Sequence, residues 1–176
     1  MPRSAPTDKI FLDHNQVAAL AEACGDYGTL VRVLAYTGLR WGEVTALRVR
    51  RVDLRRRRLH VVEAASDHSG MITIGTPKSH QQRQVPFPAF LAGELATLLH
   101  ARQADDLVFT ARSGGRLRNG NFRRDVYDSA AAKVGLRGLR IHDLRHTAAN
   151  LAKHRRRSQR EGSPADAGAR VGSHDA

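Results

Sequence analysis

The chain has 176 residues, of which 41% are apolar, so it is long enough for one domain with a core and too apolar for wholesale disorder. Its formal net charge of +12, most of it before residue 153, favours an anionic polymer or surface as partner. The single cysteine, Cys24, excludes a disulfide framework and a cysteine-based zinc site. The longest apolar stretch, near Leu30–Tyr36, is too short to span a bilayer, so we expect a cytoplasmic chain without a membrane partner.

Three helices are predicted in the first fifty residues, after a flexible lead-in at residues 1–9. Asp13 and Gln16 have the spacing of a capping box, which marks the start of a helix. Gly38 follows an apolar run and is expected to end the second helix. The predicted helices run from Asp13 through Ala21, over Thr29–Tyr36, and from Arg40 through Leu47.

The middle of the chain changes from helical to extended patterns and then back. Short β-type runs separated by Gly, Ser and Asp predict an antiparallel sheet of three strands. The predicted strands are Leu59–Val62, Met71–Ile74 and Gln84–Phe87. Helical spacing then predicts Ala89–His100, Asn121–Val134 and a last helix that begins near His142 and carries Leu144, Ala148 and Leu151. The expected fold is mainly α with a small three-stranded antiparallel sheet, in the α+β class.

The end of the sequence differs from the rest. Residues 153–176 are rich in arginine and contain one valine as their only large aliphatic residue, so they offer no apolar helix face to bury. We therefore expect a flexible lead-in at residues 1–9, one folded domain at residues 10–152 and a disordered basic tail at residues 153–176.

Two arginines stand at predicted helix starts that are about a hundred residues apart. Arg40 lies in Thr37-Gly-Leu-Arg-Trp-Gly-Glu43, and Arg145 lies in Ile141-His-Asp-Leu-Arg-His-Thr147. The N–H groups and the dipole of a helix start already favour negative charge, so an arginine there is unusual. Two arginines that hold one anion would explain it, and phosphate fits the planar guanidinium fork best. The alternative is a pair of ordinary surface arginines, with Arg40 bound to Glu43.

Three more side chains are candidates for acid–base chemistry at a phosphate. His142 can act as a general acid or base because imidazole titrates near neutral pH, and the alternative is a capping role. His142 and His146 also have the i, i+4 spacing of a zinc helix. Arg145 would repel a cation there and no third ligand is obvious, so we predict no metal and no cofactor. Lys78, in Thr76-Pro-Lys-Ser79, could protonate a leaving oxygen from a hairpin tip or could be an ordinary exposed lysine.

Seven arginines lie between residues 48 and 58. Their simplest interpretation is attraction to the DNA backbone, with an affinity that falls as salt rises. The alternative is a solvated basic loop, and the segment has no obvious base-reading motif. The predicted backbone contacts are Arg48, Arg50, Arg51 and Arg55.

Together these motifs resemble the tyrosine recombinase family, of the phage integrase type. The matching segments are Thr37–Glu43, Thr76–Ser79 and His142–Thr147, and the resemblance covers about residues 8–152. It implies a helical catalytic domain with a small sheet, which cuts DNA without a metal through a 3′-phosphotyrosine link and a free 5′ hydroxyl. It also implies double-stranded DNA as partner, together with other recombinase protomers.

The resemblance assigns a role to each matching residue. Arg40 and Arg145 would clamp the phosphate, and Lys78 would protonate the leaving 5′ oxygen. His142 would assist proton transfer. The supporting residues would be Glu43 and His146.

The sequence departs from the family pattern after residue 152. The family continues with a Leu-Gly-His motif and then the nucleophilic tyrosine, whereas here all tyrosines, Tyr27, Tyr36 and Tyr127, precede His142. Back-translated with GC-rich codons and read one nucleotide out of phase, the tail can spell a Leu-Gly-His motif, so our hypothesis is a frameshifted integrase fragment. We expect a chain that is inactive alone. The alternatives are a DNA-binding remnant without catalysis and a zinc-helix hydrolase.

Overall fold

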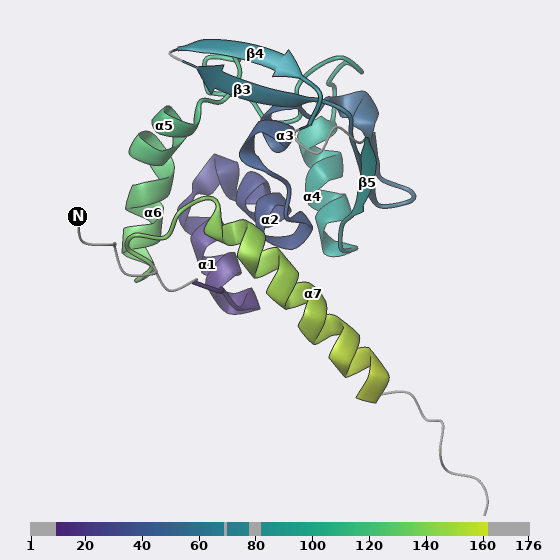
Figure 1. Cartoon of the computed structure of the whole chain (residues 1–176), viewed down its shortest axis with the longest axis vertical. Coiled ribbons are helices and arrows are strands. Elements are labelled where there is room, and N and C mark those ends of the chain that lie inside the picture. The colour runs from purple at the N-terminus through teal and green to yellow at the C-terminus, as the bar shows by residue number, and fades with distance from the viewer. Residues whose placement is uncertain (1–9, 69, 78–81, 162–176) are drawn as a thin grey trace, which may run out of the picture.

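The computed structural model of the chain describes residues 10–68, 70–77 and 82–161 (Figure 1). The predicted lead-in, Lys78 and residues 162–176 of the predicted tail lie outside the described residues. Within the described part, no helix combines the length and the apolar character needed to cross a bilayer. The α-helices are α1 (His14–Ala23), α2 (Gly28–Thr37), α3 (Trp41–Ala46), α4 (Phe90–Leu99), α5 (Asn119–Phe122), α6 (Asp128–Lys133) and α7 (Asp143–Glu161), with 3₁₀ turns η1 (Gly25–Tyr27) and η2 (Val49–Arg51).

The predicted N-terminal helices are confirmed, and so are two of their local signals. The backbone N–H of Gln16 donates to the carboxylate of Asp13 at 2.8 Å, and the backbone N–H of Asp13 donates to the side chain of Gln16 at 3.0 Å. Gly38 ends α2 with a φ of +66°. At the other end of the chain, α7 continues to Glu161, past residue 152, where we expected the folded part to end. Arginine, lysine and glutamine are good helix formers, so this basic run prolongs a helix that α2 already anchors.

The helix predicted at residues 121–134 contains a π-helical turn that the sequence did not indicate. This turn, η3 (Arg123–Tyr127), joins α5 to α6. It brings Phe122 and Tyr127, five residues apart, to one side, where both are buried and their ring centroids are 5.9 Å apart. Five residues is the hydrogen-bond spacing of a π-helix, so the turn lets both rings enter the core.

The strands of the described residues form two antiparallel sheets. They are β1 (Val52–Asp53), β2 (Arg58–Val61), β3 (Ala64–His68), β4 (Met71–Gly75) and β5 (Arg83–Pro86). One sheet has the order β1-β2-β5, and the other is the hairpin β3–β4. The predicted class, mainly α with a small three-stranded antiparallel sheet, is confirmed, and the hairpin is a second small sheet.

The predicted membership of the sheet was wrong. The run Met71–Ile74 belongs to β4 and pairs with β3, whereas β1 is the third strand of the larger sheet. Ala64–His68 lacks the alternation of apolar and polar residues that marks a strand, so β3 gave no signal in the sequence.

The core is arranged around α2, and this arrangement sets the two motifs side by side. Both α1 and the first turns of α7 pack on α2, and the C-terminal half of α7 points away from the rest (Figure 1). The predicted inner face of α7 is buried at Leu144, Ala148 and Leu151. The hairpin β3–β4 lies against α3 (Figure 1). The starts of α3 and α7 therefore meet near the end of α2.

Candidate active site

The first motif forms the connection from α2 to α3. The left-handed backbone of Gly38 lets the chain leave α2 at once. Arg40 caps α3 in an extended conformation, and its backbone N–H donates to Oε2 of Glu43 at 2.9 Å. Gly42 has no room for a side chain, because an added Cβ would lie 2.2 Å from the carbonyl oxygen of Ala65 in β3. Gly38 is therefore needed for its left-handed backbone, and Gly42 is needed because β3 approaches its backbone closely.

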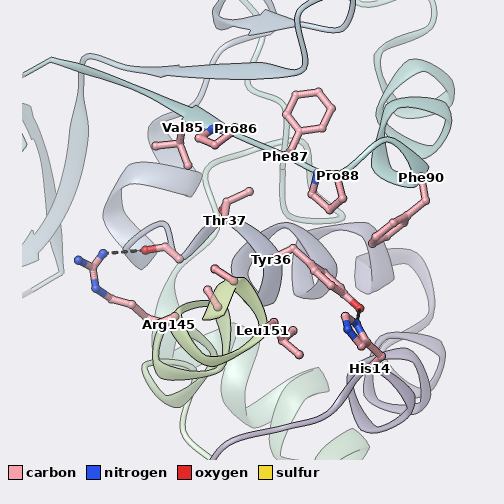
Figure 2. Close-up of a pocket in the computed structure, with 14 residues that line it drawn as sticks. His14, Tyr36, Thr37, Val85, Pro86, Phe87, Pro88, Phe90, Arg145 and Leu151 are labelled. Carbon is pink, nitrogen blue, oxygen red and sulfur yellow. Dashed lines mark hydrogen bonds between the residues drawn. The ribbon is translucent and has the colours of Figure 1, made fainter. Parts of the chain in front are cut away.

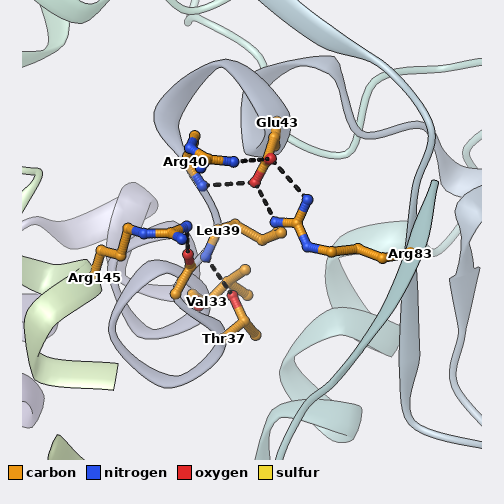
Figure 3. Close-up of polar contacts among 8 residues, drawn as sticks. Val33, Thr37, Leu39, Arg40, Glu43, Arg83 and Arg145 are labelled. Atoms are coloured by element: carbon orange, nitrogen blue, oxygen red, sulfur yellow. Dashed lines mark hydrogen bonds and ion pairs between the residues drawn. The ribbon is translucent and has the colours of Figure 1, made fainter. Parts of the chain in front are cut away.

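Glu43 is the centre of a buried ion-pair network (Figure 3). Its side chain is 1% exposed. Its Oε1 accepts hydrogen bonds from Nη1 of Arg40 at 3.2 Å and from Nη1 of Arg83 at 2.9 Å, and its Oε2 accepts one from Nη2 of Arg83 at 2.7 Å. Burial raises the pKa of Glu43, but the hydrogen bonds from Arg83 and Arg40 outweigh it and hold the pKa below its ordinary value. Glu43 is therefore a charged carboxylate that fixes two arginines.

The second motif begins α7 in a similar way. The side chain of Asp143 is 2% exposed. It accepts the backbone N–H of Arg140 at 2.9 Å and the guanidinium of Arg140 at 3.0 and 3.2 Å. Two residues further on, Nη1 of Arg145 donates to the carbonyl oxygen of Gly38 at 2.6 Å (Figure 3). This bond joins the second motif directly to the first.

Two guanidinium groups, of Arg40 and Arg83, bind the carboxylate of Glu43, and the guanidinium of Arg145 lies close enough for the charges of all three residues to affect its pKa. The pKa of Arg145 is lowered first by burial and then by the charge of Arg40, with Arg83 adding to the effect and Glu43 opposing it. Among the described residues, these three guanidinium groups and one carboxylate leave an excess of positive charge at a partly buried place. Within the described residues, Arg40 and Arg145 each use one terminal nitrogen, so their other N–H groups can bind an anion.

The histidines of the second motif flank Arg145 in the sequence. His142 is exposed and immediately precedes α7, and His146 is half-buried. Their ring centroids are 5.2 Å apart with the rings nearly perpendicular. No group of three or more His, Cys, Asp or Glu side chains in the described part of the chain is placed to hold a metal ion. The acid–base role of His142, the supporting role of His146 and the role of Lys78 stay predictions.

The predicted DNA-backbone arginines have several different environments. Nη1 of Arg48 donates to the backbone carbonyl oxygen of Asp105 at 2.7 Å, and Arg50 pairs with the carboxylate of Asp105. Arg51 is half-buried, and its Nε has no hydrogen-bond partner among the described residues. Arg55 is exposed. Contact between these residues and DNA stays a prediction.

A cavity of about 980 Å³ opens beside the arginine cluster (Figure 2). Arg145 lies at one end, and Tyr36 lies at the other with its hydroxyl 2.7 Å from Nδ1 of His14. Tyr127 is fully buried, and Tyr27 packs its ring against α5. Burial raises the pKa of both Tyr36 and Tyr127. Neither hydroxyl therefore has the lowered pKa that activates a nucleophile.

Sequence reasoning missed two arginines of these networks, Arg83 and Arg140. Arg83 carried a signal, because it shares the inward alternation of Val85 and Phe87 and so places a charge on the inner face of a strand. Arg140 carried another, because the spacing from Arg140 to Asp143 repeats that from Arg40 to Glu43.

A comparison with known protein families identifies the family of this chain. Residues 10–155 match the model of the phage integrase family. The chain belongs to this family. The resemblance drawn from the three motifs is thereby confirmed. The chain is 30% identical over 137 residues to the integrase of Mycobacterium phage FRAT1, covering 72% of this chain and 40% of the phage protein.

A bacterial relative is similarly close to this integrase-family chain. The tyrosine recombinase XerC of Corynebacterium efficiens is 31% identical over 124 residues, covering 68% of this chain and 35% of XerC. The chain thus spans 35% to 40% of the length of these two curated relatives.

Solved structures share the fold. The Tn1549 transposon integrase in complex with a circular intermediate DNA matches with a TM-score of 0.72 at 17% identity, over 85% of this chain and 55% of that chain. The XerA recombinase matches with a TM-score of 0.64 at 23% identity, over 93% of this chain and 54% of that chain. The integrase-family chain therefore has the fold of solved recombinases.

Proposed function

We propose that this chain binds double-stranded DNA and holds one backbone phosphodiester between Arg40 and Arg145, for site-specific recombination. The observation that carries the proposal is the bond from Arg145 to Gly38, which joins α7 to the motif whose Arg40 is held, together with Arg83, by the buried Glu43. The match to the integrase family and the DNA complex of a structural relative support DNA as the source of the phosphate. The net charge of +12 adds attraction that does not depend on sequence.

The cluster suits the chemistry of strand exchange. A hydroxyl oxygen attacks phosphorus and forms a new P–O bond, while the bond from phosphorus to the 5′ oxygen breaks. Negative charge grows on the phosphoryl oxygens in the transition state, where donors from Arg40 and Arg145 would stabilise it. The attacking hydroxyl loses a proton and the leaving 5′ oxygen gains one. We assign help with proton transfer to His142 and protonation of the leaving oxygen to Lys78.

The nucleophile is the part of this chemistry that these 176 residues do not supply in our proposal. No tyrosine follows Tyr127 in the sequence, and Tyr127 is buried. We therefore propose that the chain holds the phosphodiester without forming a covalent link to it. The same observation favours a second candidate, a DNA-binding protein that occupies sites or joins a complete recombinase without cleaving DNA itself.

A nicked suicide duplex tests the proposal. We expect binding that added salt weakens and that Arg40→Gln and Arg145→Gln each weaken more than Arg124→Gln, which removes the same charge at an exposed position. We also expect no adduct that survives a denaturing gel. Binding that is indifferent to Arg40 and Arg145 would overturn the phosphate site, and a covalent adduct would reveal a nucleophile within the chain.

The partners and the location follow from the proposed ligand. We propose a cytoplasmic location, where DNA is accessible to a chain whose relatives come from a bacteriophage and a bacterium. We also propose other recombinase protomers as partners. Sedimentation of the chain with and without a DNA duplex measures this association, and a single protomer at every duplex concentration would contradict it.

A further inference from the structure

Groups of the protein itself fill the hydrogen-bond acceptor positions of the Glu43 carboxylate. A carboxylate has about four positions for hydrogen-bond donors. Here two are filled by the backbone N–H and Nη1 of Arg40, and two by Nη1 and Nη2 of Arg83. Glu43 is therefore held from two sides, one within the start of α3 and the other in β5.

Arg83 is 40 residues away from Glu43 in the sequence, and the fold brings the two into contact. It is the first residue of β5 and pairs with Val61 at the end of the ladder with β2. Its side chain crosses from this strand to α3 (Figure 3). Because β2 fixes the register of β5, the direction from which Arg83 reaches Glu43 is set by the sheet and not by the helix start.

The three arginines of the cluster use their N–H donors differently. Both terminal nitrogens of Arg83 are directed at Glu43. By contrast, Arg40 and Arg145 each direct one terminal nitrogen at the protein within the described residues, which leaves donors for a ligand. The fork of Arg83 also sets the plane of the carboxylate, because two parallel N–H···O bonds allow one orientation.

Loss of Arg83 would disturb Arg40 through Glu43. A buried carboxylate with two of its four positions unfilled is costly, so it would rotate toward other donors or water. Arg40 contacts the same carboxylate and would move with it. A displaced Arg40 would no longer present its remaining N–H donors to a phosphate in the geometry that the guanidinium fork needs.

We propose that Arg83 is a positioning residue, which acts through Glu43 to hold the guanidinium of Arg40 in place for a phosphate. This inference rests on the proposed function. Arg83 does not touch the phosphate itself, and its role depends on the two-pronged geometry of its guanidinium as well as on its charge. Arg83 also adds to the positive potential at Arg145, whose pKa it helps to lower.

The test uses inorganic phosphate as probe and the 176-residue chain with ¹⁵N-labelled arginine. The Nε–H signals of Arg40 and Arg145 report phosphate binding at the cluster. Arg83→Lys keeps the charge and loses the fork, and Arg83→Gln loses both. Arg140→Gln is the matched control, because Arg140 binds a buried helix-start acid in the same bidentate way outside the cluster.

We expect both Arg83 variants to weaken phosphate binding about tenfold, the effect of one charge-assisted hydrogen bond. Arg140→Gln should bind like the wild type, although its melting temperature should also fall. In an Arg40→Gln background, Arg83→Lys should have no further effect, since its target is gone. If Arg83→Gln does not fold, the phosphate affinity of Arg83→Lys alone tests the positioning role.

Two results would overturn the positioning role alone. Wild-type affinity in Arg83→Lys would show that only the charge matters, and an equal loss in Arg140→Gln would show a general structural effect. If the wild-type chain shows no saturable response of Arg40 and Arg145 to phosphate, the proposed function falls as well.

Discussion

The two helix starts that meet at the site share a four-residue plan. Arg40 and Glu43 begin α3, and Arg140 and Asp143 begin α7. In both, a buried acid accepts the backbone N–H and the guanidinium of the arginine three residues before it. They differ in which arginine faces the cluster. At α3 it is Arg40 itself, whereas Arg140, three residues before the start of α7, is 54% exposed and Arg145 reaches the site instead.

The residue before each acid shows what surrounds the two starts. Gly42 precedes Glu43 and lies under β3, where a Cβ would meet the carbonyl oxygen of Ala65. His142 precedes Asp143 and is exposed. The same arrangement thus places a glycine against a hairpin at one start and an exposed imidazole at the other. A shared local structure can support different chemistry when its surroundings differ.

The largest expected effect comes from removing the acid at each start. Glu43→Ala leaves the guanidinium groups of Arg40 and Arg83 without their buried counter-charge, so the free energy of unfolding should fall by about 3–5 kcal/mol. Phosphate affinity should fall with it. Asp143→Ala should also lower stability but should retain more of the affinity. Urea denaturation and phosphate titration measure both quantities, and equal losses of affinity would contradict the difference between the two starts.

Removing the arginine that faces the site from α7 should affect binding more than stability. Arg145→Gln removes charge-assisted donors, so phosphate affinity should fall about 10- to 100-fold. The free energy of unfolding should change by about 1 kcal/mol, because one bond to Gly38 is lost. On DNA, the slope of log affinity against log salt should shrink by about one. An unchanged slope would place the phosphate elsewhere.

A smaller effect is expected from adding one methyl group under the hairpin. Gly42→Ala should lower the free energy of unfolding by about 1–3 kcal/mol, because its Cβ would overlap the carbonyl oxygen of Ala65. His142→Ala, at the equivalent place in the other start, should leave stability nearly unchanged since His142 is exposed. Thermal melts of the two variants compare them directly. An unchanged melting temperature in Gly42→Ala would mean that the β3–β4 hairpin can move away from α3 at little cost in free energy.

The smallest effect should appear in the pH dependence of stability. Burial raises the pKa values of Glu43 and Asp143, but the hydrogen bonds from Arg83 and Arg40 to Glu43 and from Arg140 to Asp143 outweigh it and lower both. A carboxylate with a lowered folded-state pKa adds stability above its unfolded pKa and loses it as the pH falls through the folded value. Stability should therefore decline below about pH 5. Glu43→Gln should make this decline shallower in urea titrations, and an unchanged curve would contradict the role of Glu43.

Local signals predicted much of the fold. The capping box at Asp13, the glycine at Gly38 and helical spacing each depend on neighbours within a few residues, and these signals were confirmed. The strand β3 was missed because its sequence, Ala64–His68, has no alternation. The π-helical turn was missed because the reason for it, the burial of both Phe122 and Tyr127, depends on the tertiary core.

The candidate site could be predicted only in part. Arg40 and Arg145 were identifiable because a positive side chain at a helix start conflicts with the helix dipole. Arg83 was not, because its partner is 40 residues away in sequence and their contact depends on the register between β2 and β5. A charged residue in phase with Val85 and Phe87 is the signal that would have found it.

The saturated carboxylate of Glu43 has a consequence for the thermodynamics of recognition. A long arginine side chain loses up to about 2 kcal/mol of rotamer entropy when it is immobilised. Here that loss is incurred when the polypeptide folds, because Glu43 already restrains Arg40 and the carbonyl of Gly38 already restrains Arg145. An incoming phosphodiester would meet a pre-organised receptor, and little of its binding enthalpy would be offset by ordering the protein.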